Sequence, residues 1–273
     1  MRPRQFFVNS KKYRIMKVFL QKFSCMLIGA LANLRLPAFV MKPVFLVYSL
    51  IFRIDNSQFQ INLKGLVSFN MYFTRQFRNG MRSFNGSVAS PAEGRIYASG
   101  KMENNRLLQI KHQTIHVKNL IGFEPEKLRG FVSIYLSPAN YHRVHAPCDM
   151  EIQNIRYVPG AYYSVAPRFA RSEKVYLKNE RIVLTCDTPK GKMVMVLIAA
   201  LNVGNICLVS LDDLAPQGKP ARNIEPKNGP VRFKQGDEIA HFNIGSSVVL
   251  LCEEEFPESD QIRNVLLGDE LMD

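Results

Sequence analysis

Short apolar runs separated by turn-forming residues fill the chain from Ser87 to Leu251, and this pattern limits the possible folds more than any other feature. Each run is alternating or continuously apolar and is bounded by Gly, Pro, Asn or Asp. Such runs are typical of strands in an antiparallel sandwich or barrel. They cover residues 95–98, 107–110, 130–136, 182–186, 193–198, 206–210 and 247–251. We therefore predict an α+β chain whose body, residues 81–273, is a mainly antiparallel β domain.

Residues 1–80 form a second region with a different composition. Ten Lys or Arg residues and no acidic residue lie between Met1 and Ile54, interleaved with Phe, Leu and Ile. This mixture suits helices that lie in the headgroup layer of an anionic membrane. No apolar run reaches the ~20 residues that span a bilayer, because charged residues and prolines interrupt it. We predict helices over residues 11–54, broken at Pro37 and Pro43, that associate with a membrane without crossing it.

Other interpretations of the basic region stay open. The helices could pack on the protein's own core, or roughly the first twenty residues could be a cleaved import peptide. The net charge of +13 also allows a nucleic-acid partner, although aromatic-basic surface motifs are lacking. The five scattered cysteines favour reduced thiols in a cytosolic compartment over a disulfide framework or a zinc site.

Two further segments carry structural expectations. One or two helical turns are predicted within residues 69–78. Residues 214–231 hold four prolines among Lys, Gly and Asn and predict a long surface loop.

The Gly245-Ser246 peptide bond is the first candidate for chemistry. It lies in a Gly-Ser-Ser turn between two apolar runs. In one interpretation Ser246 only hydrogen-bonds a tight turn. In the other its hydroxyl attacks the carbonyl of Gly245, converts the amide to an ester and cuts the chain. Glycine suits this second role because it has no Cβ to obstruct the attack.

Two histidines and a carboxylate are the remaining candidates. His142 and His145 follow an apolar run directly and precede a proline. We expect proton transfer here and no metal. Glu93 lies in a Pro-Ala-Glu-Gly turn. With His145 and Ser246 it could complete a nucleophile in which the carboxylate orients the imidazole and the imidazole takes the hydroxyl proton.

Six segments, taken in order, resemble the phosphatidylserine decarboxylase proenzyme family. They extend over most of the chain, and their order and spacing are more specific than any one of them. The segments are Phe69-Asn70-x-x-Phe73-x-Arg75, Ser90-Pro91-Ala92-Glu93-Gly94, Tyr135-Leu136-Ser137-Pro138-x-x-Tyr141-His142-Arg143-Val144-His145-x-Pro147, Val158-Pro159-Gly160, Asn179-Glu180-Arg181 and Phe242-x-Ile244-Gly245-Ser246-Ser247-Val248.

The resemblance implies a protein that makes its own cofactor. Ser246 would attack Gly245, and elimination and hydrolysis would leave a pyruvoyl group at residue 246, dividing the chain into a large and a small piece. By position, His145 is the processing base and Glu93 orients it. The pyruvoyl group would bind the amine of phosphatidylserine, and His142 would protonate the carbon left by departing carbon dioxide. The resemblance also implies a peripheral membrane protein, on the cytoplasmic face of the cell membrane if bacterial, that forms a homodimer.

Departures from the family pattern accompany these matches. Glu93 replaces the usual Asp and moves the carboxylate by one methylene, which could misorient His145. Asn140 stands in place of Asp, and Arg82-Ser83 in place of Arg-Pro. Two alternatives therefore remain: a decarboxylase of another amine-bearing substrate, and a membrane-bound scaffold that keeps the fold without cutting itself.

Overall fold

The computed structural model describes residues 27–110, 113–166, 174–200, 206–209, 220–224, 229–243, 246–259 and 261–272. Several expectations fall outside these ranges. They are the possible import peptide, the first seven basic residues, residues 11–26 of the predicted helices, Cys25, residues 214–219 and 225–228 of the predicted loop, and Gly245.

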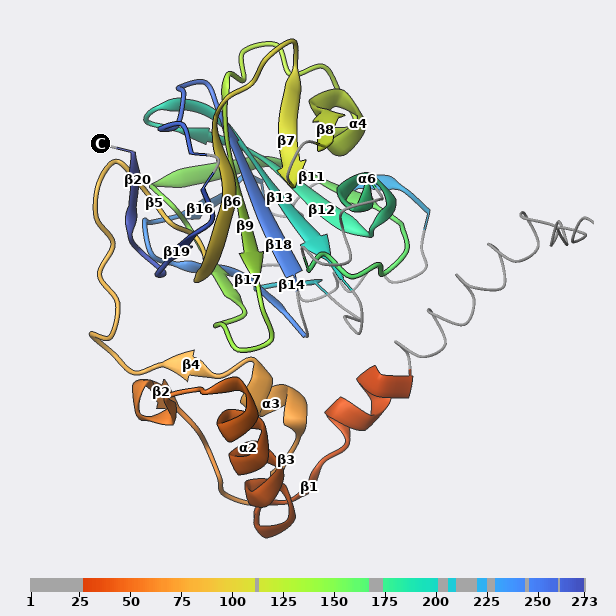
Figure 1. Ribbon diagram of the computed structural model, residues 1–273, viewed down its shortest axis with the longest axis vertical. Helices are drawn as coiled ribbons and strands as arrows, with labels where there is room; N and C mark the ends of the chain where they lie inside the picture. Colours follow the sequence, from red (N-terminus) through yellow and green to blue (C-terminus); the bar gives the residue numbers. More distant parts are fainter. Residues whose placement is uncertain are drawn as a thin grey trace, which may run out of the picture.

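A large antiparallel sheet forms the body of the molecule (Figure 1). Its order is β15-β11-β12-β13-β18-β9-β6-β19, and β16 also pairs with β11. The strands are β6 (Gly94–Lys101), β9 (Gly130–Leu136), β11 (Met150–Val158), β12 (Arg181–Thr188), β13 (Gly191–Ala199), β15 (Arg222–Ile224), β16 (Val231–Phe233), β18 (Ser246–Cys252) and β19 (Arg263–Val265). The strand-rich, antiparallel α+β fold expected from the sequence is thereby confirmed.

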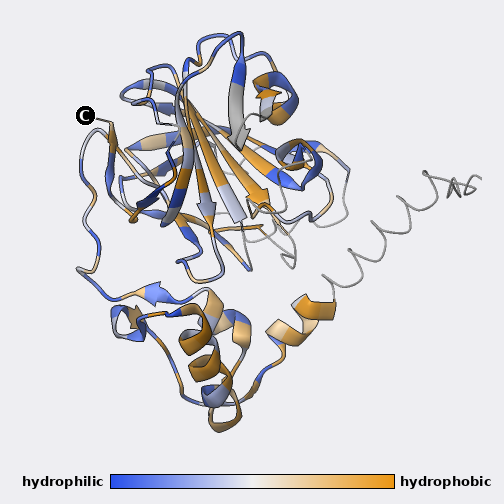
Figure 2. Ribbon diagram, in the orientation of Figure 1, coloured by the Kyte–Doolittle hydropathy of each residue, from blue (hydrophilic) through white to orange (hydrophobic). Residues whose placement is uncertain are grey.

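The centre of this sheet is the most apolar part of the body. All seven residues of β18 are buried, as are the last seven of β13. Figure 2 shows the same strands in hydrophobic colours. Strands buried on both faces read as continuous apolar runs, which is why these two are conspicuous in the sequence.

Smaller sheets complete the body. Strands β10 (Arg143–His145), β17 (Glu238–Phe242) and β14 (Ile206–Leu208) form a three-stranded sheet. Two two-stranded sheets pair β7 (Arg106–Ile110) with the next strand, β8 (Gln113–His116), and β5 (Val88–Ala89) with β20 (Glu270–Met272) from the other end of the chain. Short helices α4 (Val117–Ile121) and α6 (Val175–Lys178) contact each other beside the large sheet.

The N-terminal region lies below the body in Figure 1. Residues 27–33 are helical, and α2 (Ala38–Phe52) packs against α3 (Phe69–Phe73). Short strands complete the region: β1 (Leu36–Pro37) pairs with β3 (Leu66–Val67), and β2 (Phe59–Gln60) pairs with β4 (Gln76–Phe77). None of the helices in the described ranges is both long and apolar enough to cross a bilayer.

The helical turns expected within residues 69–78 are confirmed by α3, after which the chain turns into β4. Two other expectations about local structure were wrong. Helix α2 continues through Pro43 instead of ending there, although a proline inside a helix removes one backbone hydrogen bond. Within the predicted loop the structure has β15, whose three residues pair with Ile155, Arg156 and Tyr157 of β11.

Candidate active site

Ser246 is the first residue of β18 and not part of a turn. It pairs with Leu136 of β9 on one side and with Ala199 of β13 on the other. The residue is fully buried, and its Oγ makes no hydrogen bond within the described part of the chain. A buried hydroxyl is normally hydrogen-bonded, so one without a partner calls for a functional explanation.

Backbone hydrogen bonds bring the histidine motif beside the segment that leads to Ser246. Strand β10 pairs with β17, with Arg143 opposite His241 and His145 opposite Glu238. The Phe242 amide donates to the carbonyl of His142 at 2.9 Å. Strand β17, which shares a sheet with β10, therefore ends only a few residues before the predicted cleavage bond.

The turn that carries Glu93 is anchored to the same strand. The His145 amide donates to the Pro91 carbonyl at 2.9 Å, and the Ala89 amide donates to the Pro147 carbonyl at 2.8 Å. Three of the segments that resemble the family are thus joined by main-chain hydrogen bonds.

His142 is completely buried against the ring of Phe73, with ring centroids 4.2 Å apart. Its Nδ1 lies 2.8 Å from the carbonyl oxygen of Asn140. Because a carbonyl only accepts, Nδ1 carries the proton and Nε2 has a free lone pair. Burial lowers the pKa of His142 to about 3, although this hydrogen bond acts in the opposite direction. Nε2 is buried and makes no hydrogen bond to any described residue.

His145 has the same tautomer. Its Nδ1 donates to the Gly236 carbonyl at 2.7 Å, and its Nε2 accepts from the Tyr141 hydroxyl at 3.1 Å. Burial lowers the pKa of His145 despite the bond to Gly236. Burial also raises the pKa of Tyr141, so the hydroxyl keeps its proton. Both imidazoles are therefore neutral at pH 7, as a general base requires.

Glu93 faces Arg82 in this structure. Its Oε2 accepts hydrogen bonds from Arg82 Nε at 2.9 Å and Nη2 at 2.7 Å, and the Arg82 guanidinium stacks over Phe77. Within the described residues no hydrogen bond joins Glu93 to His145. The Gly236 carbonyl has the orienting position on His145 that the resemblance assigns to Glu93, and the role of Glu93 stays a prediction.

Gly236 could not be predicted as a site residue from the sequence. Its contribution is a backbone carbonyl, which has no side-chain signature. Tyr141 belongs to the histidine-containing segment that resembles the family, but its contact with His145 depends on how β10 folds back beside the preceding loop. Arg82 entered the sequence analysis only as part of the Arg82-Ser83 pair that stands in place of Arg-Pro.

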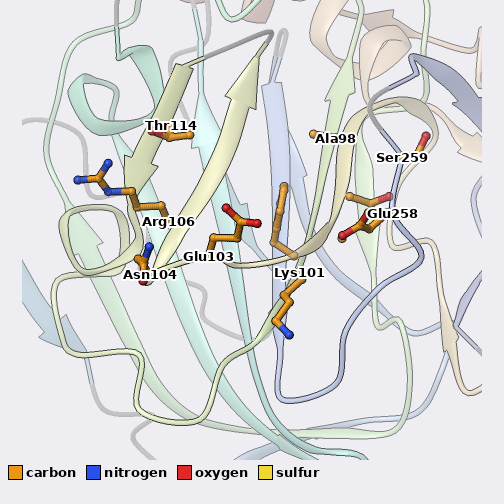
Figure 3. A pocket seen from close by; sticks show the side chains of 11 residues that line it. Ala98, Lys101, Glu103, Asn104, Arg106, Thr114, Glu258 and Ser259 are labelled. Carbon is orange, nitrogen blue, oxygen red and sulfur yellow. The ribbon is translucent and has the colours of Figure 1, made fainter.

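A separate hollow lies elsewhere on the body. It has a volume of about 670 Å³ and is lined by β6, the β6–β7 connection and residues near Ser259 (Figure 3). Phe131, in its wall, is five residues along β9 from the Leu136 that pairs with Ser246, a separation of roughly 17 Å. No described side chain in its lining has a buried polar atom without a partner. The hollow therefore offers no chemistry comparable with that around Ser246.

Comparison with known proteins agrees with the geometry. A family model described as phosphatidylserine decarboxylase matches residues 69–271. The chain is 33% identical over 242 residues to a phosphatidylserine decarboxylase proenzyme from Campylobacter jejuni, covering 85% of this chain and 90% of that one. The chain belongs to the phosphatidylserine decarboxylase family. Proenzymes of the same name from Acidovorax ebreus and Acinetobacter baylyi are 34% and 35% identical, over 76% and 71% of this chain and 78% and 70% of theirs.

Membership of the phosphatidylserine decarboxylase family confirms the resemblance drawn from the six segments. It also bears on Ser246 Oγ and His142 Nε2, which have no partner among the described residues, because the names of these relatives state that they are made as proenzymes.

Proposed function

We propose that the protein is a self-processing decarboxylase that converts phosphatidylserine to phosphatidylethanolamine and carbon dioxide at a membrane surface. One observation supports this most directly: Ser246, at the position of the predicted cleavage, is fully buried with its Oγ unpartnered among the described residues. In a simple structural turn this hydroxyl would have a hydrogen-bond acceptor nearby.

Self-cleavage begins at Ser246. Its Oγ attacks the carbonyl carbon of Gly245, the C–O bond forms, and the Gly245-Ser246 C–N bond breaks to leave an ester. His145 is the base for the hydroxyl proton, since its Nε2 lone pair is available once the Tyr141 hydroxyl turns away. The Gly236 carbonyl keeps the ring in the tautomer that this step needs. Elimination and hydrolysis then convert residue 246 to pyruvoyl with release of ammonia.

The residues around β18 fit a pyruvoyl group at position 246. The group supplies a carbonyl that accepts the electrons left by departing carbon dioxide. His142 transfers the proton in this reaction. Its neutral Nε2 accepts a proton from the substrate's ammonium group and later returns it to the carbon that has lost carbon dioxide. Burial keeps water from competing for this proton.

The outer face of α2 supports membrane association. Phe39, Leu46, Leu50 and Ile51 are each more than half exposed. An exposed apolar face of this size is unusual on a soluble monomer. We assign the protein to a membrane surface as a peripheral protein, on the cytoplasmic face in a bacterial cell. The homodimer expected from the resemblance stays a prediction.

Intact-mass spectrometry of the purified protein tests the proposal. We expect two chains divided between residues 245 and 246, the smaller with a blocked N-terminus, and a Ser246→Ala variant that remains one chain of 31.2 kDa. A wild-type chain that stays whole on long incubation would contradict self-processing. Decarboxylation of phosphatidylserine vesicles by the cut protein, compared with release from free serine, then tests the substrate.

The Arg82–Glu93 pair favours a second candidate, a membrane-bound homologue that does not cut itself. In this structure the pair holds the only carboxylate that the family pattern offers to His145. Replacing Glu93 by Asp separates the candidates. If the wild-type chain is whole and Glu93→Asp is cut, the scaffold candidate is correct. If both are cut, Glu93 is no obstacle to processing.

A further inference from the structure

A pocket of about 260 Å³ lies where the N-terminal region meets Arg143, the first residue of β10. Helix α2, the β2–β3 connection and the α3–β4 segment form most of its wall, and Arg143 of β10 closes it. Its lining includes Phe45, Val67, Met71, Thr74, Arg75 and Arg143. Arg143 lies between His142 and His145 in sequence, and Thr74 follows the Phe73 ring that packs on His142. The pocket therefore adjoins the reaction centre.

Arg75 is the unusual residue in this wall. It is only 2% exposed, and its ring neighbours are Phe59, 4.3 Å from the guanidinium carbon, and Tyr72 at 5.4 Å. Its Nη2 donates to the Ala139 carbonyl at 3.1 Å, and Nη1 lies 3.5 Å from the Phe73 carbonyl. Its Nε is buried and makes no hydrogen bond among the described residues.

No carboxylate in the described part of the chain forms an ion pair with Arg75. A buried guanidinium is ordinarily matched by an anion, because an unpaired charge in a protein interior is costly. Burial accordingly lowers the pKa of Arg75. The two aromatic rings and the main-chain carbonyls offset part of this cost but carry no negative charge.

The second guanidinium of the pocket is already neutralised. Arg143 donates through Nη1 to both carboxylate oxygens of Glu238, at 2.7 and 2.6 Å, and through Nε to the Thr74 carbonyl. The net positive charge of the pocket therefore comes from Arg75. The amides of Gln60, Asn62 and Gln76 add hydrogen-bond donors around it.

Apolar side chains line the pocket as well. Phe45 and Val67 are buried, and Met71 is partly exposed. A cation and amides together with aliphatic and aromatic groups match the junction of a phospholipid, where a phosphate meets glycerol and acyl chains. Arginine is well suited to phosphate because its planar fork matches two phosphate oxygens.

We propose that this pocket binds the phosphate of the lipid headgroup, with the Arg75 guanidinium as its principal ligand. The inference rests on the proposed function, since it assigns the substrate's phosphate to a place beside His142. Held there, the lipid extends its acyl chains toward α2 and its serine toward the histidines.

Calorimetric titration of the purified, self-cleaved protein with glycerophosphoethanolamine tests the site. This soluble probe carries the phosphodiester but no carboxylate and is not a substrate. We expect Arg75→Gln to weaken binding by about 10- to 100-fold, the range for a hydrogen bond to a charged group. The matched control is Arg78→Gln, which changes an exposed arginine of the same segment outside the pocket; its affinity should stay within twofold. Arg75→Lys keeps the positive charge but lacks the planar guanidinium with its paired donors. This variant replaces Arg75→Gln in the titration if Arg75→Gln does not fold.

The other arms identify the ligand. Equal affinity of wild type and a folded Arg75 variant would overturn the proposal. Binding of glycerophosphoserine alone would mean that Arg75 holds the serine carboxylate instead, and inorganic phosphate binding as tightly as the diester would mean a free-phosphate site. In vesicle assays we expect the KM for phosphatidylserine to rise by a similar factor with little change in kcat. Because the titration needs no turnover, it separates failure of this site from failure of the decarboxylase assignment.

Discussion

The buried, neutral state of His142 predicts a specific loss of stability in mild acid. Its pKa is about 3 in the folded chain against an ordinary value of 6.5. Below pH 6.5 the unfolded chain therefore binds a proton that the folded chain refuses. The stabilising contribution is complete above pH 6.5 and is lost progressively as the pH falls toward 3.

The size of the effect follows from the two pKa values. Between pH 7 and pH 5 this one histidine should remove about 2 kcal/mol from the free energy of unfolding. The figure barely depends on the folded pKa provided that it lies below about 4. His145 adds a further loss of the same sign, since burial lowers its pKa too.

The assay is urea unfolding followed by circular dichroism, because the chain has no tryptophan to report by fluorescence. The background is Ser246→Ala, which keeps the chain whole and removes a hydroxyl that has no hydrogen-bond partner among the described residues. In this background His142→Asn, whose amide can still donate to Asn140, should lose about 2 kcal/mol less than its parent between pH 7 and pH 5. A variant at the exposed His116, His116→Gln, should follow the parent. If His142→Asn also follows the parent, His142 is not a buried neutral base, and its assigned proton transfer has no foundation.

Two further predictions concern the motif at Gly160 and the outer face of α2. A Cβ at Gly160 would lie 2.3 Å from main-chain atoms of Asn179 and Glu180, so Gly160→Ala should destabilise the chain by about 3 kcal/mol or more in thermal unfolding. The control Gly29→Ala should not destabilise it, because its new Cβ meets no atom within 4 Å. Equal stability of the two variants would show that the segment at Gly160 does not contact the segment at Asn179. Leu50 and Ile51 are 68% and 69% exposed, and replacing both by Gln should weaken the affinity for anionic vesicles, measured by sedimentation, by roughly 30-fold without lowering Tm. The control Leu266→Gln changes an exposed leucine outside the N-terminal region and should bind as wild type. Unaltered binding of the double variant would place the membrane contact elsewhere.

The strands that the sequence predicted best are those whose side chains are buried on both faces. Strands β13 and β18 are continuous apolar runs and needed no knowledge of their neighbours. Strand β11 was missed because its apolar period is interrupted: the register with β12 shifts between Ile152 and Asn154, so Gln153 is an extra residue in the alternation. A bulge of this kind is decided by the partner strand and leaves only a disturbed pattern in the sequence.

The candidate site likewise has a part that the sequence predicts, the identity of its residues, and a part that it does not, their contacts. Ser246, His142, His145 and Glu93 could be proposed as site residues because their side chains have chemical signatures and because the family pattern orders them. The contacts of these residues were not predictable. Gly236 acts through a main-chain oxygen, and the choice of Arg82 as partner for Glu93 depends on how the segment before β5 folds over Phe77.

The position of Ser246 at the head of a central strand bears on the fate of the protein after the cut proposed above. The segment released by that cut would keep β18 between β9 and β13, β19 against β6, and β20 against β5. The small chain would therefore stay paired with the large one, with its first strand buried between two strands of the large chain. Once unfolded, the two chains must find each other by diffusion, so refolding becomes a second-order reaction that slows on dilution. The mature protein is consequently assembled once, as a single chain, and its lifetime is set by how slowly it unfolds.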